Sequence, residues 1–215
     1  MTLPDKPPLL ATVFSDYICP FCYVGDARLQ RLRADYDLKI NWCFLEIHPE
    51  TPAAGMPIAE LGYPAQQWRR MMDTLDVLAA EEGLDLQSHD FTTNSHQALL
   101  LAEAAREAGT AVFYRLHRRL FEAFFCEGRN IGDVTELRIL ARESGLADAT
   151  VARAWEDPRY EQRLAEYRAA ARELGVQATP TIFFGKQQRL DGVQPLPAFR
   201  EAAAAGFREQ RALQD

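Results

Sequence analysis

The sequence has few cysteines, a deficit of positive charge and no long hydrophobic run. Four cysteines in 215 residues are too few for a disulfide-stabilised scaffold. Lysine and arginine total 24 against 31 aspartate and glutamate, and the net charge of −7 argues against general binding to nucleic acids or anionic membranes. No segment approaches the roughly 18 apolar residues that a membrane-spanning helix needs. We therefore expect neither a nucleic-acid partner nor a membrane partner.

The N-terminal stretch MTLPDKPPLL lacks the pattern of a signal peptide. No positively charged region precedes a long apolar run, and Pro4, Pro7 and Pro8 interrupt the segment. We therefore expect a cytoplasmic protein, in which a close cysteine pair is more often catalytic or metal-binding than structural. The hydrophobic fraction of 47% is ordinary for a globular chain, and a chain of this length can bury a sizeable core.

Hydrophobic periodicity divides the chain into three parts. Residues 9–16 and 37–47 are predicted strands, and the segment between them has helical spacing. From about 59 to 174 the patterns are helical only, and most of them are closed by a glycine. Residues 176–214 then predict a strand, a hairpin partner and a closing helix. The order is β-α-β, a helical region and β-β-α.

The two ends of the chain are predicted to complete each other. A β-α-β unit alone cannot cover both faces of its sheet, so the C-terminal β-β-α part must join it. We therefore expect one discontinuous α/β domain, formed by residues 1–56 and 175–215. Residues 57–174 form a helical insertion in this scheme.

The motif Cys19-Pro20-Phe21-Cys22 follows the first predicted strand and opens the first predicted helix. Proline suits the first helical turn, where its missing N–H would have no partner in any case. Cys19 then lies over the positive end of the helix dipole, which stabilises a thiolate. Cys22 lies one turn deeper on the same face. This geometry predicts an outer nucleophile and an inner thiol that resolves a mixed disulfide.

The cysteine pair has two other interpretations. A zinc site needs four ligands, and the other cysteines, Cys43 and Cys126, have no partner at metal spacing, so no metal site is expected. The pair can also be inert, because free cysteines are often buried. We assign Cys43 and Cys126 to packing.

Thr179-Pro180 stands directly before the late strand, at a position where proline is tolerated because the strand has not yet begun. With the cysteine motif, this feature resembles the DsbA-like branch of the thioredoxin fold. The resemblance is closer to the cytoplasmic dithiol–disulfide isomerases first associated with polyketide gene clusters. SDYICPFCYVG is similar to their S-D-x-x-C-P-W-C-Y-x-G, and Gly192-Val193-Gln194-Pro195 is similar to their G-A-Q-P stretch.

The resemblance implies an α/β thioredoxin fold with an inserted all-helical domain, and a cis peptide bond at Thr179-Pro180. It also implies a thiol–disulfide oxidoreductase or isomerase that acts on thiol- or disulfide-containing proteins. Cys19 and Cys22 would be catalytic, and the substrate-binding residues would be Pro20, Phe21, Thr179 and Pro180. No cofactor is expected beyond the redox-active disulfide, although glutathione as electron partner and a homodimer both stay open.

The sequence departs from the family pattern at two positions. Phe21 stands where tryptophan is common, and Leu99 replaces a histidine, which leaves His96 as a surface or cleft-edge residue. Related glutathione-dependent isomerases and transferases, which act on small aromatic substrates, typically have serine at the position of Cys19. They remain the alternative function, and a redox-inactive binding module is a third.

Overall fold

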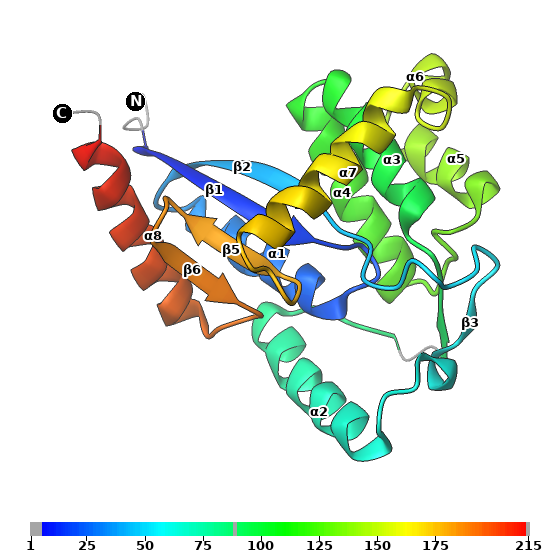
Figure 1. Cartoon of the computed structure of the whole chain (residues 1–215), viewed down its shortest axis with the longest axis horizontal. Coiled ribbons are helices and arrows are strands. Elements are labelled where there is room, and N and C mark those ends of the chain that lie inside the picture. Colours follow the sequence, from blue (N-terminus) through cyan, green and yellow to red (C-terminus); the bar gives the residue numbers. More distant parts are fainter. Residues whose placement is uncertain (1–5, 88–89, 214–215) are drawn as a thin grey trace.

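A four-stranded mixed sheet joins the two ends of the chain (Figure 1). The computed structural model describes residues 6–87 and 90–213. The central strand β1 pairs in parallel with β2 and antiparallel with β5, and β6 extends the sheet beyond β5. The strand order β2-β1-β5-β6 confirms the predicted thioredoxin fold. The strand bounds are β1 (Pro8–Ser15), β2 (Asp37–Phe44), β5 (Thr181–Phe184) and β6 (Gln188–Asp191).

Helices cover both faces of the sheet. Successive side chains of β1 point to opposite faces, so Val13 joins the main hydrophobic core while Phe14 packs on the other side. On the Val13 side, α8 (Leu196–Ala212) lies against β1, β5 and β6, and α1 (Pro20–Leu32) packs beside α8. On the Phe14 side, α7 (Pro158–Glu173) contributes Ala171.

The region between β2 and β5 is mostly helical but contains one short strand pair. The prediction of helices only from about 59 to 174 misses β4 (Phe91–Thr92), which pairs antiparallel with β3 (Met56–Pro57) just before that range. Strands of two residues leave no periodic signal. A 3₁₀ turn, η1 (Ile58–Leu61), follows β3. The remaining helices are α2 (Ala65–Glu82), α3 (His96–Glu107), α4 (Thr110–Phe125), α5 (Val134–Glu143) and α6 (Asp148–Arg153).

The predicted domain boundaries remain predictions. Residues 1–5 and 214–215 of the expected outer domain, and residues 88–89 of the expected insertion, lie outside the described residues. One continuous hydrophobic core includes side chains from the sheet and from α3, α4 and α5. Helices α3, α4 and α5 are therefore packed on the sheet through shared core residues.

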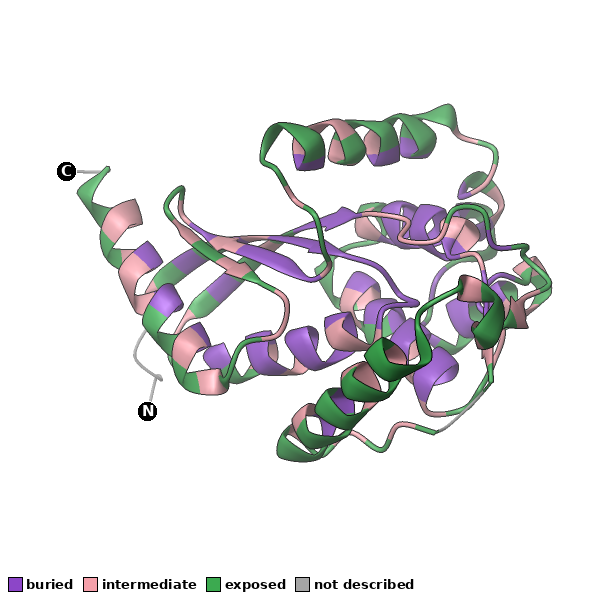
Figure 2. Cartoon of the chain, turned by 60° about the horizontal axis from the view of Figure 1, so that its bottom comes forward, coloured by how far each residue is buried: buried purple, intermediate pink, exposed green. Residues whose placement is uncertain are grey.

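Helix α2 is the most exposed of the long helices (Figure 2). Only Leu75 and Ala79 are buried in it, and they pack against Val24 of α1. Helix α2 is therefore attached to the rest of the protein along one narrow stripe, and its other faces are exposed. Within the described ranges, no helix is both long and apolar enough to cross a bilayer.

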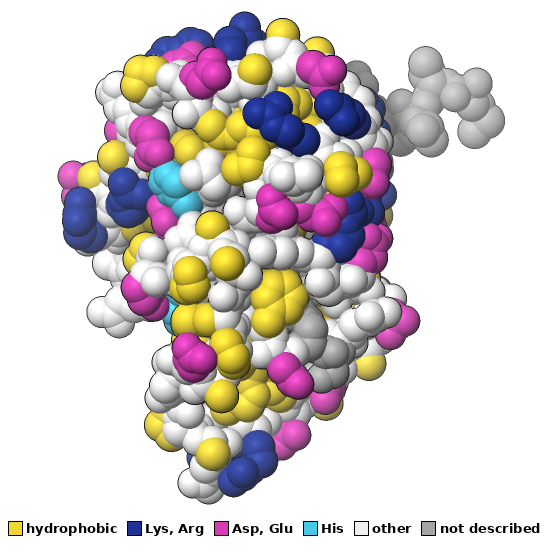
Figure 3. All heavy atoms as spheres, turned by 90° about the vertical axis from the view of Figure 1, so that its right-hand side faces the viewer, with side chains coloured by type: hydrophobic (Ala, Val, Ile, Leu, Met, Phe, Trp, Pro, Cys, Tyr) yellow, Lys and Arg dark blue, Asp and Glu magenta, His cyan; other side chains and the backbone are white. Residues whose placement is uncertain are grey.

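Charged side chains on the face in Figure 3 are mixed in sign. Lysine and arginine form small separate groups among acidic and apolar side chains on this face. Binding to a polyanion requires clustered positive charge. This face therefore offers no continuous cationic surface among the described residues.

Candidate active site

The two cysteines of the predicted motif lie at the junction between β1 and α1. Cys19 is the N-cap residue with extended backbone angles (φ −93°, ψ 111°), and Pro20 is the first helical residue. The amide of Cys22 donates to the carbonyl of Cys19 at 3.0 Å, which closes the first turn. Both thiols are free, and the exposed fractions are 5% for Cys19 and 1% for Cys22.

The environment separates the acidities of the two thiols. The pKa of Cys19 is lowered, chiefly because the Cys22 thiol hydrogen-bonds to it, and burial opposes this effect. The pKa of Cys22 is raised well above its usual value, chiefly by burial and then by its interaction with Cys19. An outer sulfur can therefore carry the negative charge while the inner sulfur keeps its proton.

The loop before β5 lies directly against the outer thiol. The Thr179-Pro180 peptide bond is cis, as predicted. The Cys19 thiol donates to the carbonyl of Thr179 at 3.4 Å, across 160 residues of sequence. Pro180 is buried, and its own carbonyl accepts from the amide of Gly192 at 2.8 Å. The fold thus brings the cysteine motif and the proline loop together.

A buried guanidinium connects the Gly192–Pro195 stretch, which follows β6, to α1 and α2. Arg28 of α1 is fully buried and donates to the carbonyl of Gln194, in the Gly192–Pro195 stretch. It also binds Glu81 at 2.5 Å and Glu82 at 3.1 Å, at the end of α2. Two carboxylates offset the charge of this buried cation, and the Gln194 carbonyl accepts a further hydrogen bond from it. Arg28 was not predicted, because neither this stretch nor α2 is near it in sequence.

Phe21 lies at the edge of an open cleft of about 550 Å³. The opposite wall is the N-terminal half of α2, and among the described residues that line the cleft only Arg70 is charged. Phe21 is partly exposed and also packs on the cluster that attaches α2 to α1. The cleft therefore offers apolar surface, neutral hydrogen-bonding groups and one cation beside the cysteine motif. Its lining is Phe21, Pro64, Gln66, Gln67, Arg70, Met71 and Thr74.

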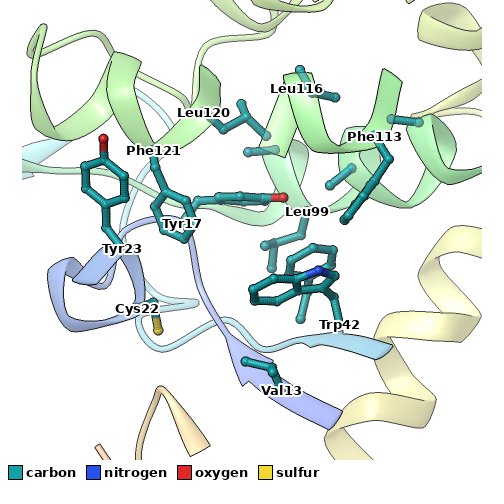
Figure 4. Packing of buried hydrophobic residues seen from close by; sticks show 14 of the residues in the cluster. Val13, Tyr17, Cys22, Tyr23, Trp42, Leu99, Phe113, Leu116, Leu120 and Phe121 are labelled. Carbon is teal, nitrogen blue, oxygen red and sulfur yellow. The ribbon is translucent and has the colours of Figure 1, made fainter. Parts of the chain in front are cut away.

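Aromatic side chains support the inner side of the motif (Figure 4). Tyr17, Cys22 and Tyr23 belong to the same hydrophobic core, and Tyr23 stacks on Phe121 of α4 at 5.2 Å between ring centroids. The Tyr17 hydroxyl hydrogen-bonds to His117 Nδ1 at 2.8 Å, and both side chains are buried. The residues on both sides of the thiols are therefore packed against α4.

Leu99, which departs from the family pattern, and the nearby His96 have structural roles. Leu99 is fully buried in the core, where it replaces a polar ring with an apolar side chain (Figure 4). His96 is partly exposed and bridges Glu46 at 2.8 Å and Glu161 at 2.6 Å. Its pKa is raised to about 9, mainly by the hydrogen bond to Glu46. His96 is thus a cationic link between segments.

The two remaining cysteines differ in burial. Cys43 is buried against Phe14 and Ala171, as predicted. The prediction for Cys126 is only partly right, because it lies at the C-cap of α4, where the chain leaves the helix, and is partly exposed. Its sulfur lies 3.9 Å from the Tyr23 hydroxyl. In the described residues, no group of three or more potential ligands is arranged to hold a metal ion.

Asp16 is a buried acid that the sequence interpretation did not single out. It lies between β1 and Cys19, and its side chain is fully buried. Its carboxylate accepts from the amide of Ile47 at 2.8 Å and from that of Ile18 at 3.4 Å. The aspartate three residues before the motif was part of the quoted family pattern, so a signal for it was present in the sequence.

The chain is similar to known proteins in both sequence and structure. A family model described as DSBA-like thioredoxin domain matches residues 12–204. The uncharacterized protein YwbO of Bacillus subtilis (strain 168) is 29% identical over 180 residues, which cover 80% of this chain and 85% of that protein. A probable DsbA oxidoreductase from Streptomyces coelicolor superposes with a TM-score of 0.82 at 24% identity, covering 94% of this chain and 91% of that chain.

A further structural neighbour is the cytosolic disulfide reductase DsbM from Pseudomonas aeruginosa. It superposes with a TM-score of 0.65 at 19% identity, covering 96% of this chain and all of that chain (100%). The same reductase has also been solved with GSH, and that structure has a TM-score of 0.63. At these identities the likeness concerns the fold.

Proposed function

The chain belongs to the DSBA-like thioredoxin domain family of thiol–disulfide oxidoreductases, and from this premise we propose that Cys19 and Cys22 exchange disulfides with protein substrates. The observation that carries the proposal is the contrast between the two thiols. Cys19 has a lowered pKa at a helix N-terminus, and Cys22 has a raised pKa behind it. A thiol that ionises readily at the outer position, with a protonated thiol behind it, fits first attack by Cys19 and later resolution by Cys22.

The exchange reaction consists of two displacements at sulfur. The Cys19 thiolate attacks a substrate disulfide, forms a mixed disulfide and releases one substrate sulfur as a thiolate, which takes up a proton. Cys22 then loses its proton, attacks the Cys19 sulfur and releases the second substrate thiolate. Two electrons pass from the dithiol to the substrate, and the enzyme keeps a Cys19–Cys22 disulfide. Isomerisation occurs when the substrate's own thiol resolves the mixed disulfide.

The surroundings of Cys19 support binding of an extended substrate. The backbone around Thr179 lies beside the attacking sulfur and can pair with a peptide in strand-like fashion. Pro20 and Phe21 offer apolar contact on the other side, where the cleft toward α2 begins. We assign Pro20, Phe21, Thr179 and Pro180 to substrate binding on these grounds.

Glutathione is the electron partner that we propose. Two molecules of reduced glutathione return the enzyme disulfide to the dithiol and leave as oxidised glutathione. The cleft beside Phe21 contains a cation, Arg70, that suits a peptide thiol with two carboxylates. A solved relative of this fold has GSH bound and is described as cytosolic. We accordingly place the reaction in the cytoplasm, with no cofactor other than the dithiol.

Insulin reduction and refolding of scrambled ribonuclease test the proposal. The wild type should be active in glutathione buffer, and Cys19→Ser should be inactive in both assays. Cys22→Ser should accumulate mixed disulfides at Cys19 that mass spectrometry detects. Cys43→Ser is the matched control, because this cysteine is buried away from the motif and its variant should keep full activity. Wild-type inactivity in both assays contradicts the proposal.

The alternative, glutathione-dependent isomerisation of a small aromatic substrate, makes a different prediction. Such chemistry does not need Cys19 as a redox nucleophile, because related enzymes typically use serine at that position. Turnover of a chromene carboxylate that survives in Cys19→Ser would favour this alternative. Turnover in neither assay would favour a redox-inactive binding module.

A further inference from the structure

Arg28 is a fully buried cation on α1, the helix that carries the cysteine motif. Its guanidinium donates through Nη1 to the carbonyl of Gln194, through Nη2 to Glu81 at 2.5 Å and through Nε to Glu82 at 3.1 Å. The acceptors belong to the C-terminal end of α2 and to the Gly192–Pro195 stretch, which connects β6 to α8. Because the fork of a guanidinium is planar and rigid, it holds both segments in a fixed position relative to α1.

The Gly192–Pro195 stretch in turn supports the proline loop. The amide of Gly192 donates to the carbonyl of Pro180 at 2.8 Å. The carbonyl of Thr179, one residue earlier, lies 3.4 Å from the Cys19 sulfur. Since the stretch and the loop share a hydrogen bond, a displacement of the stretch also moves the backbone that faces the thiol.

The other two partners of Arg28 anchor α2. Leu75 and Ala79 are the buried apolar residues of this helix, and the ion pairs lie beyond them at its C-terminal end. The side chain of Glu82 is almost fully buried and also binds Arg31 at 3.3 Å. A helix is a stiff rod, so the anchor at this end also determines where the N-terminal half, which forms the wall of the cleft, lies.

We propose that Arg28 is a positioning residue that couples the cleft wall on α2 to the proline loop, so that a substrate held against α2 lies in line with the Cys19 sulfur. This role rests on the proposed function, in which Cys19 is the attacking thiol. Arg28 acts through the carbonyl of Gln194 on one side and through Glu81 and Glu82 on the other. A thiolate must approach a disulfide along the axis of the sulfur–sulfur bond, so a small displacement of the bound substrate slows exchange steeply.

Arg28→Lys tests the proposal, because it keeps the charge and replaces the rigid fork with a single ammonium group. Two disulfides are compared as oxidants of the reduced protein by stopped flow. Oxidised glutathione is long enough to extend from Cys19 toward the cleft, whereas bis(2-hydroxyethyl) disulfide has no peptide group and no carboxylate. The rate constant for oxidised glutathione should fall about tenfold in the variant, since the substrate is displaced from the attacking sulfur.

The small disulfide distinguishes positioning from general loss of structure. Its rate constant should be the same in the wild type and in Arg28→Lys, because it does not contact the wall on α2. A variant that is merely less stable would leave the ratio of the two rate constants unchanged. An unchanged ratio, with both rate constants equal to those of the wild type or both reduced by the same factor, would overturn the inference.

Arg31→Lys is the matched control. Arg31 is on the same helix and binds the same carboxylate of α2, but it is about half exposed, and within the described residues its ion pair is with Glu82 alone. This variant should keep the wild-type rate constants for both disulfides. A loss with oxidised glutathione equal to that of Arg28→Lys would show that the link to the Gly192–Pro195 stretch has no role.

A second measurement leaves Arg28 in place and decides the coupling even if Arg28→Lys fails to fold. Glu82→Gln removes one charged partner on α2, and the amide of Gly192 should then exchange its hydrogen about tenfold faster, because the stretch opens locally. Amides of β1, which pair with both neighbouring strands, should exchange at the wild-type rate. Wild-type exchange at Gly192, or an equal increase in β1, would overturn the inference.

Hydrogen exchange does not require turnover, so the two proposals fail separately. A wild type that is inactive on insulin and on scrambled ribonuclease would refute the proposed function. The exchange rate of the Gly192 amide in Glu82→Gln would still show whether α2 and the proline loop are coupled through Arg28.

Discussion

Gly25 of α1 lies directly against the ring of Pro180. A β-carbon added at residue 25 would come within 3.1 Å of the Pro180 Cγ atom and 3.9 Å of a methyl group of Val193. The helix that begins at Cys19 and the loop that faces it are therefore in contact one turn beyond the motif. The same two segments meet at the motif, where the Cys19 thiol lies 3.4 Å from the carbonyl of Thr179.

Gly25→Ala should reduce activity by displacing the proline loop. The added methyl group would lie closer to Pro180 than an ordinary van der Waals contact. Pro180 must therefore move by a few tenths of an ångström. Overpacking of this kind costs about 1–3 kcal/mol when the surroundings cannot adjust. We expect kcat/KM for insulin reduction to fall severalfold while the variant still folds. Wild-type kinetics in a folded variant would show that the contact has no role in positioning the loop.

Gly206→Ala tests a second closely packed glycine. Gly206 belongs to α8 and lies against Phe184, at the opposite end of β5 from Pro180. A β-carbon there would lie 2.5 Å from the Phe184 β-carbon and 2.6 Å from its carbonyl oxygen. The glycine in α8 therefore permits close packing on the sheet and is not merely a weak helix position. Thermal unfolding should show a larger loss of stability than in Gly25→Ala, with normal activity per folded molecule at low temperature.

The four thiols of the reduced protein should differ in reactivity. We expect iodoacetamide at neutral pH to modify Cys19 first, because its pKa is lowered. Cys126 should follow, because it is partly exposed although its pKa is raised. Cys43 should be slow, because it is buried and its pKa is raised to about 11, and Cys22 should also be slow. Peptide mapping gives the order, and modification of Cys43 before Cys19 would contradict it.

Arg70→Glu should weaken the use of glutathione. Arg70 is the cation in the cleft beside Phe21, and reversing its charge places a carboxylate where the carboxylates of glutathione would bind. The KM for glutathione should rise about tenfold, since a charge-assisted contact contributes about 1.5 kcal/mol or more. Stopped-flow reduction of the enzyme disulfide measures this effect.

Arg69→Glu makes the same charge change on the adjacent residue of α2. Arg69 is exposed and does not line the cleft. Its variant should change the KM for glutathione only through general electrostatics, which physiological salt screens. An equal increase in both variants would show that net charge matters and that the cleft does not bind glutathione.

His96 should stabilise the fold most strongly below neutral pH. Its folded-state pKa, about 9, lies above the unfolded value of 6.5, because Glu46 and then Glu161 bind the charged ring. The folded state therefore holds a proton that the unfolded state has lost above pH 6.5, and this stability disappears as pH rises through 9. The loss should be on the order of 1 kcal/mol, since solvent screens this partly exposed site.

His96→Gln should remove that part of the pH dependence. Urea unfolding between pH 7 and 10 should give a smaller decline in unfolding free energy than the wild type shows. His48→Gln is the control, because His48 faces a single carboxylate, Glu50, at 3.4 Å. A decline in His96→Gln equal to that of the wild type would exclude the ion pairs as its cause.

The local features of this protein follow from its sequence. The apolar run before Cys19, the alternation in 37–47 and the glycine-terminated helices predict elements that the structure confirms, because each depends on residues close in the chain. Pro20 and the cysteine spacing predict a helix with a thiol at its N-terminus for the same reason. The neighbourhood of Cys19 and Thr179 was predicted only through the family resemblance.

The tertiary structure decides what surrounds these local features. Arg28 bridges α2 and the Gln194 loop, and Gly25 and Gly206 are required by contacts with segments more than twenty residues away in sequence. The acidity of Asp16 depends on its burial, to which segments beyond its own turn contribute. Burial and electrostatic fields are sums over all neighbours in space, so residue type and spacing alone do not determine them. The sequence by itself determined that a thiol stands at a helix N-terminus, and the packing around it decided how acidic that thiol is.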